Sequence, residues 1–318
     1  MLYALFLILV GFVLLIGGAE YLVRGAVAIA NKLKIPPVIV GLTIVAFGTS
    51  TPEFVVSIKA AFNGVAGISI GNIVGSNIAN ILLILGVTAV IYPIVCNRTE
   101  FLRDYKFLLF VTVLFSILAM TGTFVMWHGI LMLAILFGFI YFNYRNSKDG
   151  EVAEDTQSSL ADKNWGIVVL VTCVGLAAIM YGSDLLVKGA IEVARILGVS
   201  EEIIGLTIVA VGTSLPELAT TVVAAIRKQN GVALGNIVGS NIWNIVFIMG
   251  LTSSIIDVDV PRQFMLYDIW IMLAATLLLL PTMLTKNNLS RGEGALFLLL
   301  YAGYIVSQVL LARGIWVL

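Results

Sequence analysis

The chain carries the stretch GLTIVAFGTSTPE at residues 41–53 and the stretch GLTIVAVGTSLPE at residues 205–217, an offset of 164 residues. A second pair at the same offset reads GNIVGSNIANI at 71–81 and GNIVGSNIWNI at 235–245. The segment Gly11–Gly86 aligns without a gap with the segment Gly175–Gly250. Shared apolar composition does not reproduce glycine, threonine, proline and glutamate in register, so the chain contains an internal repeat.

The composition around this repeat is that of a membrane protein. Of the 318 residues, 60 % are hydrophobic and 11 % are charged, whereas a soluble domain has about a quarter of its residues charged. The 18 basic and 18 acidic side chains balance without a long basic cluster, which argues against nucleic-acid binding. Two cysteines and one histidine are too few for a disulfide framework or a histidine metal site.

Stretches long enough to cross a bilayer recur along the whole chain. A spanning helix needs about 20 mostly apolar residues, because its backbone polar groups must be satisfied within the segment. Ten stretches meet this requirement, at residues 2–31, 36–62, 68–94, 104–121, 125–144, 165–194, 200–226, 232–255, 266–284 and 292–311. We therefore predict an all-α membrane protein with ten transmembrane helices.

One long polar segment divides these spans into two groups of five. We predict a first five-helix repeat at residues 1–144, a solvated cytoplasmic linker at 145–164 and a second five-helix repeat at 165–318. Because five is odd, the second repeat enters the membrane from the opposite side, so the repeats have inverted topology. Inverted repeats are typical of secondary transporters, whose central site is reached from either side.

The distribution of Lys and Arg predicts the orientation. If the N-terminus is outside, thirteen of the eighteen basic residues lie on the cytoplasmic side, as the positive-inside rule requires. We therefore expect an integral multi-pass protein of the plasma membrane, with both termini extracellular, that functions as a monomer.

Glu53 and Glu217 are the two carboxylates that the predicted spans place deep in the membrane. A charge at the bilayer centre costs at least ~2.5–3.5 kcal/mol, and no Lys or Arg lies at a comparable depth. A bound cation or a proton is therefore expected to compensate the two glutamates. Five other acidic residues lie near span ends, where a solvated charge is the usual interpretation: Glu20, Asp184, Asp257, Asp259 and Asp268.

Oxygen-bearing side chains surround both glutamates in the sequence. Pro52 and Pro216 lack an N–H and clash with the carbonyl four residues back, so each predicts a helix break that frees backbone carbonyls beside the hydroxyls of Thr49, Ser50, Thr213 and Ser214. The second repeated stretch adds two pairs at i and i+4, each on one helix face: Ser76 with Asn80, and Ser240 with Asn244. Asn72 and Asn236 are expected beside the site rather than in contact with an ion. An all-oxygen ligand set suits Ca²⁺ and Na⁺.

The repeated stretches closely resemble the α-repeats of the calcium/cation antiporter superfamily, in particular those of prokaryotic sodium/calcium exchangers. The resemblance implies ten transmembrane helices, of which the second, third, seventh and eighth form a compact core and the long first and sixth slide across it. It also implies several sodium sites that overlap one calcium site. Carried over position by position, the ligands are Glu53, Glu217, Thr49, Ser50, Thr213, Ser214, Ser76, Asn80, Ser240 and Asn244, with backbone carbonyls of Ala46 and Ala210.

Asn244 departs from part of the family. Archaeal exchangers of this type can carry an aspartate at this position, and potassium-dependent relatives also have an acid there, so the asparagine argues against potassium dependence. Proton/calcium exchangers of the superfamily usually replace the Thr-Ser pair with an asparagine-containing turn. The pairs Thr49-Ser50 and Thr213-Ser214 therefore favour Na⁺ as the coupling ion.

The sequence thus favours a Na⁺/Ca²⁺ antiporter with a mid-membrane site, and an antiporter that couples H⁺ to Ca²⁺ or another divalent cation through the same glutamates is the alternative. A channel commonly builds its pore from a ring of subunits, whereas here both ligand sets lie in one chain. An enzyme is not favoured, because there is neither a helical histidine pair nor a phosphate-binding loop. No cofactor is expected, and the partners are the transported Ca²⁺ and Na⁺ and the lipid bilayer.

Overall fold

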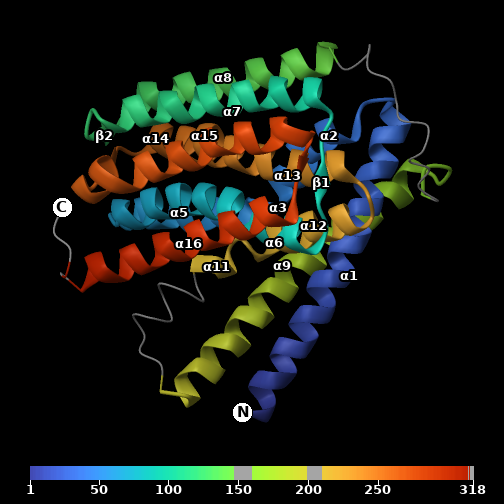
Figure 1. Ribbon diagram of the computed structural model, residues 1–318, viewed down its shortest axis with the longest axis horizontal. Helices are drawn as coiled ribbons and strands as arrows, with labels where there is room; N and C mark the ends of the chain where they lie inside the picture. The colour runs from blue at the N-terminus through green and yellow to red at the C-terminus, as the bar shows by residue number, and fades with distance from the viewer. Residues whose placement is uncertain (147–159, 199–209, 314, 316–318) are drawn as a thin grey trace. The chain divides into compact units, whose positions relative to one another are not determined.

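The computed structural model describes residues 1–146, 160–198, 210–313 and 315, and helices dominate these parts of the chain (Figure 1). Two compact units form, one from residues 1–50 with 147–236 and the other from residues 51–146 with 237–318. We call them the first and the second unit. Each draws segments from both halves of the sequence, and the predicted repeat boundaries at 144 and 165 stay a prediction. Of the predicted linker at 145–164, residues 147–159 lie outside the described residues.

Two long helices of the first unit, α1 (Leu2–Leu33) and α9 (Trp165–Ile196), lie side by side (Figure 1). Glycines allow their backbones to approach closely: a Cβ atom on Gly18 would lie 2.7 Å from the carbonyl oxygen of Gly175, and one on Gly182 would lie 2.8 Å from that of Gly11. The glycines recur every seven residues on both helices, so they fall on one helix face. Small residues at such a spacing let membrane helices pack through backbone contacts.

The rest of the first unit consists of short helices around two interruptions. They are α2 (Pro37–Val40), η1 (Gly41–Val45), α3 (Ala46–Thr49), α11 (Ala210–Gly212), α12 (Leu215–Ile226) and the start of α13 (Asn230–Ile242). The chain leaves the helical conformation at Ser50 (φ −82°, ψ 7°) and at Ser214 (φ −91°, ψ 6°). Each break lies two residues before a proline, because proline is tolerated only in the first turn of the next helix. The predicted breaks are confirmed.

The second unit contains the remaining helices. They are α4 (Thr51–Phe62), α5 (Ala66–Ala79), η2 (Asn80–Ile84), α6 (Leu85–Ile91), α7 (Arg98–Ala119), α8 (Met126–Asn146), η5 (Trp243–Met249), α14 (Gly250–Ile255), η6 (Phe264–Asp268), α15 (Ile269–Lys286) and α16 (Arg291–Ala312). Stacking of Phe107 on Phe139, with ring centroids 3.8 Å apart, joins α7 to α8. Two antiparallel bridges tie loops together: β1 (Ile94–Val95) pairs with β4 (Asn288–Leu289), and β2 (Thr123–Phe124) with β3 (Val258–Asp259).

Seven helical segments of the described chain are long and apolar enough to cross a membrane, and an eighth is added if the pair Pro37–Thr49 and Thr51–Phe62 is one interrupted span. Large apolar side chains are exposed on these segments, among them Leu9, Phe12 and Leu299, as expected of helices that face lipid. The helix α7 has 22 residues but carries Arg103, Asp104 and Lys106 close together, and the predicted span 200–226 begins in residues outside the description. An all-helical, multi-span membrane protein is therefore confirmed, whereas the count of ten stays a prediction.

Candidate functional site

In the first unit, Glu217 lies in the first turn of α12 and its side chain is 1 % exposed. Ser50 lies at the helix break of the other repeat. Its hydroxyl donates a hydrogen bond to Glu217 Oε1 at 3.0 Å. The neighbouring Thr49 hydroxyl lies 3.1 Å from Asn236 Oδ1 and 3.3 Å from the carbonyl oxygen of Ala46. The break at Ser50 thus places hydroxyl and carbonyl oxygens beside a buried carboxylate that is 167 residues away in the chain.

Equivalent hydrogen bonds in the two repeats hold the main chain at both glutamates. In the second unit, Asn72 Nδ2 donates to the carbonyl oxygen of Glu53 at 2.9 Å and to Ser57 Oγ at 2.8 Å. The corresponding bonds of Asn236 Nδ2 go to the carbonyl oxygen of Glu217 at 3.4 Å and to Thr221 Oγ1 at 3.0 Å. Both asparagines therefore position a glutamate through its main chain, and their expected place beside an ion site stays a prediction.

Buried amides gather where α5 and α13 end. Asn80 Nδ2 donates to Asn241 Oδ1 at 3.1 Å, and both side chains, like those of Ser240 and Asn244, are at most 1 % exposed. Among the described residues, several of these atoms have no hydrogen-bond partner: Asn80 Oδ1, Asn241 Nδ2, Ser240 Oγ and both amide atoms of Asn244. A buried polar atom without a partner costs about 1–3 kcal/mol, so the oxygens among these atoms are candidates for contacts with a cation or water, and the NH₂ groups for contacts with water.

One π-helical segment begins at Asn80 and another begins one residue before Asn244. The segment η2 starts at Asn80, and η5 contains Asn244, which is the repeat-equivalent position 164 residues later. The wider helical turn breaks the regular hydrogen-bond ladder, and such π segments occur frequently at functional sites. The sequence pattern did not predict them, because the apolar periodicity of the two helices does not distinguish α from π turns.

The structure distributes the predicted ligands over the two units. The first unit contains Ala46, Thr49, Ser50 and Glu217, together with the half-buried Thr213 and with Ser214, which is 2 % exposed. Ala210 begins α11, and its side chain lies outside the description. The second unit contains Glu53, Ser76, Asn80, Ser240 and Asn244, all at most 5 % exposed. The sequence pattern did not single out Asn241, which accepts a hydrogen bond from the predicted ligand Asn80, although its place in the repeated GSN triplet was a signal.

The predicted solvation of Asp268 is wrong. Its carboxylate is fully buried and accepts hydrogen bonds from Tyr304 Oη at 3.0 Å, from Gln308 Nε2 and from Gln263 Nε2 at 3.3 Å. The partners Tyr304 and Gln308 lie on α16, so the sequence next to Asp268, at the end of η6, does not reveal them. Asp104, the repeat-equivalent residue, is also buried and pairs with Arg103 at 2.8 Å. Glu53 and Glu217 are therefore not the only buried carboxylates.

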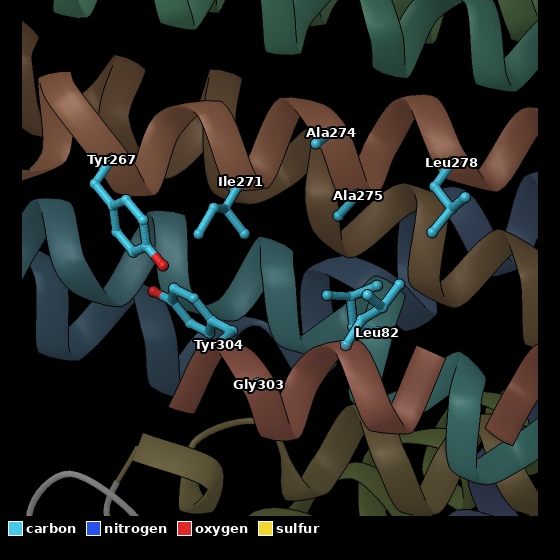
Figure 2. A pocket seen from close by; sticks show the side chains of 9 residues that line it. Leu82, Tyr267, Ile271, Ala274, Ala275, Leu278, Gly303 and Tyr304 are labelled. Carbon is cyan, nitrogen blue, oxygen red and sulfur yellow. The ribbon is translucent and has the colours of Figure 1, made fainter. Parts of the chain in front are cut away.

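A cavity of about 390 Å³ lies between α15, α16 and Leu82 of the second unit. Figure 2 shows an apolar lining, with the hydroxyls of Tyr267 and Tyr304 directed toward one another at one end. The lining contains no carboxylate, so this cavity does not suit a divalent cation. In the described part of the chain, no group of three or more His, Cys, Asp or Glu side chains forms a metal cluster. The oxygen-rich segments around the two glutamates are the better candidates.

The chain resembles known proteins over nearly its whole length. The model of the sodium/calcium exchanger protein family matches residues 3–145 and 167–310. The chain is 38 % identical to the putative antiporter CaxA of Alkalimonas amylolytica, with 96 % of this chain and 98 % of that protein covered. It is 33 % identical to the sodium/calcium exchanger MaX1 of Methanosarcina acetivorans, with 94 % and 97 % covered.

A solved structure of the sodium-calcium exchanger NCX_Mj, soaked with Na⁺ and without Ca²⁺, superposes with a TM-score of 0.83 at 30 % identity. The match covers 96 % of this chain and 99 % of that one. The resemblance drawn from the repeated motifs is confirmed. The chain belongs to the sodium/calcium exchanger protein family, and it is an integral membrane protein that acts as a cation/Ca²⁺ antiporter.

Proposed function

We propose that this protein exchanges Na⁺ for Ca²⁺ by alternating access, with Glu53 and Glu217 as the two carboxylate ligands of the transported ions. The observation that carries the proposal is the hydrogen bond from Ser50 to Glu217 at 3.0 Å. It joins two predicted ligands that come from different repeats, both almost fully buried. Their oxygen atoms are the ligands that hard cations prefer in proteins.

The remaining ligands of the proposed site are the other oxygen groups of the repeated stretches. They are the side chains of Thr49, Thr213, Ser214, Ser76, Asn80, Ser240 and Asn244, and the backbone carbonyls of Ala46 and Ala210. The matching contacts of Asn72 with Glu53 and of Asn236 with Glu217 support equivalent roles for the two glutamates. Together these groups supply enough oxygens for the six to eight that Ca²⁺ takes.

Two observations support Na⁺ rather than H⁺ as the coupling ion. The hydroxyls of Thr49 and Ser50 lie beside the Glu217 carboxylate and its positioning asparagine, and neutral oxygens of this kind can coordinate Na⁺ but are not needed to carry a proton. The relative MaX1 and the solved NCX_Mj are both named as sodium/calcium exchangers.

The test is ⁴⁵Ca²⁺ uptake into proteoliposomes loaded with Na⁺, with K⁺, with choline, or with an acidic interior, for the wild type and for Glu217→Gln. We expect uptake only with internal Na⁺, and loss of at least 90 % of it in the variant, because one of the two carboxylates is gone. Asp268→Asn is the matched control, since it also neutralises a buried carboxylate but is expected to keep Na⁺-driven uptake. Uptake driven by the pH gradient would transfer the coupling to H⁺, and uptake without a counter-ion would contradict antiport.

The absence of an acid at position 244 leads to a separate prediction. Both amide atoms of Asn244 are buried and have no hydrogen-bond partner within the described chain. Asn244→Asp would add a third carboxylate to the proposed ligand set, so we expect the apparent KM for Ca²⁺ to fall severalfold or transport to respond to K⁺. Initial rates of ⁴⁵Ca²⁺ uptake, measured with and without K⁺, check this. Unchanged Ca²⁺ affinity and unchanged ion dependence would remove position 244 from the site.

A further inference from the structure

The hydrogen bond between Asn80 and Asn241 crosses from η2 to α13, between residues 161 positions apart. Both side chains are at most 1 % exposed, so water does not compete freely for the amides. A buried hydrogen bond between two side chains restricts the rotation of both amide groups. The contact therefore determines in which direction the remaining amide atoms point.

Each of the two amides keeps one hydrogen-bonding group that has no partner among the described residues. An asparagine amide offers one carbonyl oxygen and one NH₂ group. Asn80 uses its NH₂ group toward Asn241, and Asn80 Oδ1 has no partner among the described residues. Asn241 uses its oxygen, and Asn241 Nδ2 has no partner in the same part of the chain. Asn80 therefore keeps an unused carbonyl oxygen, which is a ligand for hard cations, whereas Asn241 keeps only a donor, which is not.

The repeat-equivalent residues do not reproduce this arrangement. Asn77, at the position that corresponds to Asn241, donates to the Ile73 carbonyl oxygen of its own helix at 2.7 Å. Asn244, which corresponds to Asn80, has no hydrogen-bond partner at either amide atom in the described residues. The two repeats thus share their sequence here but differ in contacts within the described residues: the Asn80 amide is bonded to Asn241, whereas the Asn244 amide has no hydrogen-bond partner.

We propose that Asn241 is a positioning residue that holds the Asn80 amide with its carbonyl oxygen directed toward the transported cation, and that Asn77 has no such role. The inference rests on the proposed function, since the cation is the transported Ca²⁺ or Na⁺. Asn241 contributes no ligand of its own. Without this contact, the Asn80 side chain would lose rotational freedom each time a cation binds. Because Asn241 already restricts the side chain, this entropic cost is smaller and cation affinity is higher.

The matched pair Asn241→Leu and Asn77→Leu tests the proposal, because leucine has the same branching at Cγ as asparagine but no hydrogen-bonding group, and both variants add the same extra volume. The readouts are equilibrium ⁴⁵Ca²⁺ binding to the purified protein in detergent, and the KM and kcat of Na⁺-driven uptake. For Asn241→Leu we expect Kd and KM to rise about tenfold with kcat within about twofold of the wild type, since the lost contact acts on binding. For Asn77→Leu we expect both constants to stay within about twofold.

Asn241→Asp provides the rescue. It keeps an oxygen that accepts the hydrogen bond from Asn80 and loses only the NH₂ group that is not used, so Ca²⁺ should bind no more weakly than to the wild type. In Asn80→Asp/Asn241→Asp, two carboxylates would face each other without a donor, and we expect a loss of binding greater than the sum of the single effects. These two variants carry the test alone if Asn241→Leu does not fold, as judged by size-exclusion chromatography.

The outcomes separate this inference from the proposed function. Equal changes in Asn241→Leu and Asn77→Leu, a change in kcat without a change in KM, or Asn241→Asp binding as weakly as Asn241→Leu would overturn the positioning role while wild-type exchange stands. Absence of Ca²⁺ binding and of Na⁺-driven uptake in the wild type would instead contradict the proposed function.

Discussion

The side chains of Asn72 and Asn236 donate hydrogen bonds to the main-chain carbonyl oxygens of Glu53 and Glu217, respectively. Asn72 donates to both the Glu53 carbonyl and Ser57 at less than 3 Å, so Asn72→Asp replaces a donor by an acceptor next to two oxygens. We expect a loss of about 1–3 kcal/mol in the free energy of unfolding, the cost of unsatisfied buried groups. Thermal unfolding in detergent checks this. Asn97→Asp is the control, since Asn97 only accepts from backbone N–H groups at the start of α7, and an aspartate can do the same; equal loss in both variants would contradict the role of Asn72.

Cys96 illustrates how burial alters the chemistry of a residue in a loop. Burial raises the pKa of its thiol above the usual value, so less thiolate is present at neutral pH than in an exposed cysteine. In a Cys173→Ala variant, the maleimide reaction of Cys96 should be slow at pH 7 and should keep rising above about pH 8.5, the usual thiol pKa. Stopped-flow labelling against glutathione checks the prediction. A rate at pH 7 equal to that of glutathione would show that the thiol is not buried.

At the scale of elements, the contact of α1 with α9 depends on the absence of side chains. A Cβ atom on Gly18 would lie 2.7 Å from Gly175 O and 2.8 Å from Ile179 N, closer than atoms can approach. We expect Gly18→Ala to lower the free energy of unfolding by about 1–3 kcal/mol, because backbone must shift to make room. Gly138→Ala on α8 is the control: a Cβ atom there meets nothing within 4 Å, and alanine favours a helix by up to about 1 kcal/mol. Equal melting temperatures of the two variants would contradict the close packing.

At the scale of the whole molecule, the proposed exchange moves net charge. Two glutamates are neutralised by one Ca²⁺, so more than two Na⁺ would form a complex of net positive charge, and the family resemblance suggests three Na⁺ per Ca²⁺. One net charge gains about 2.3 kcal/mol per 100 mV, which corresponds to about a fiftyfold shift of the equilibrium Ca²⁺ ratio. Proteoliposomes clamped with K⁺ and valinomycin should show this shift in steady-state ⁴⁵Ca²⁺ distribution. A distribution that does not depend on voltage would indicate electroneutral exchange.

Part of this architecture is predictable because it depends on local chemistry. Hydropathy over about 20 residues gives the membrane class, and the prolines at 52 and 216 give the helix breaks, since proline acts on its own turn. The repeated oxygen-bearing stretches give the candidate ligands and the family. None of these inferences requires knowledge of which helices touch.

From the residues alone it follows that the chain is a repeated, helical membrane protein with two glutamates deep in its predicted spans among oxygen groups. The folded chain sets which groups meet: Ser50 lies against Glu217, Asn80 against Asn241, and Asp268 against Gln308. A hydrogen bond acts over about 3 Å, whereas these partners are separated by 40 to 167 residues along the chain, so the local sequence does not reveal them. Packing brings them together, and packing also makes equivalent residues such as Asn77 and Asn241 differ in what they contact.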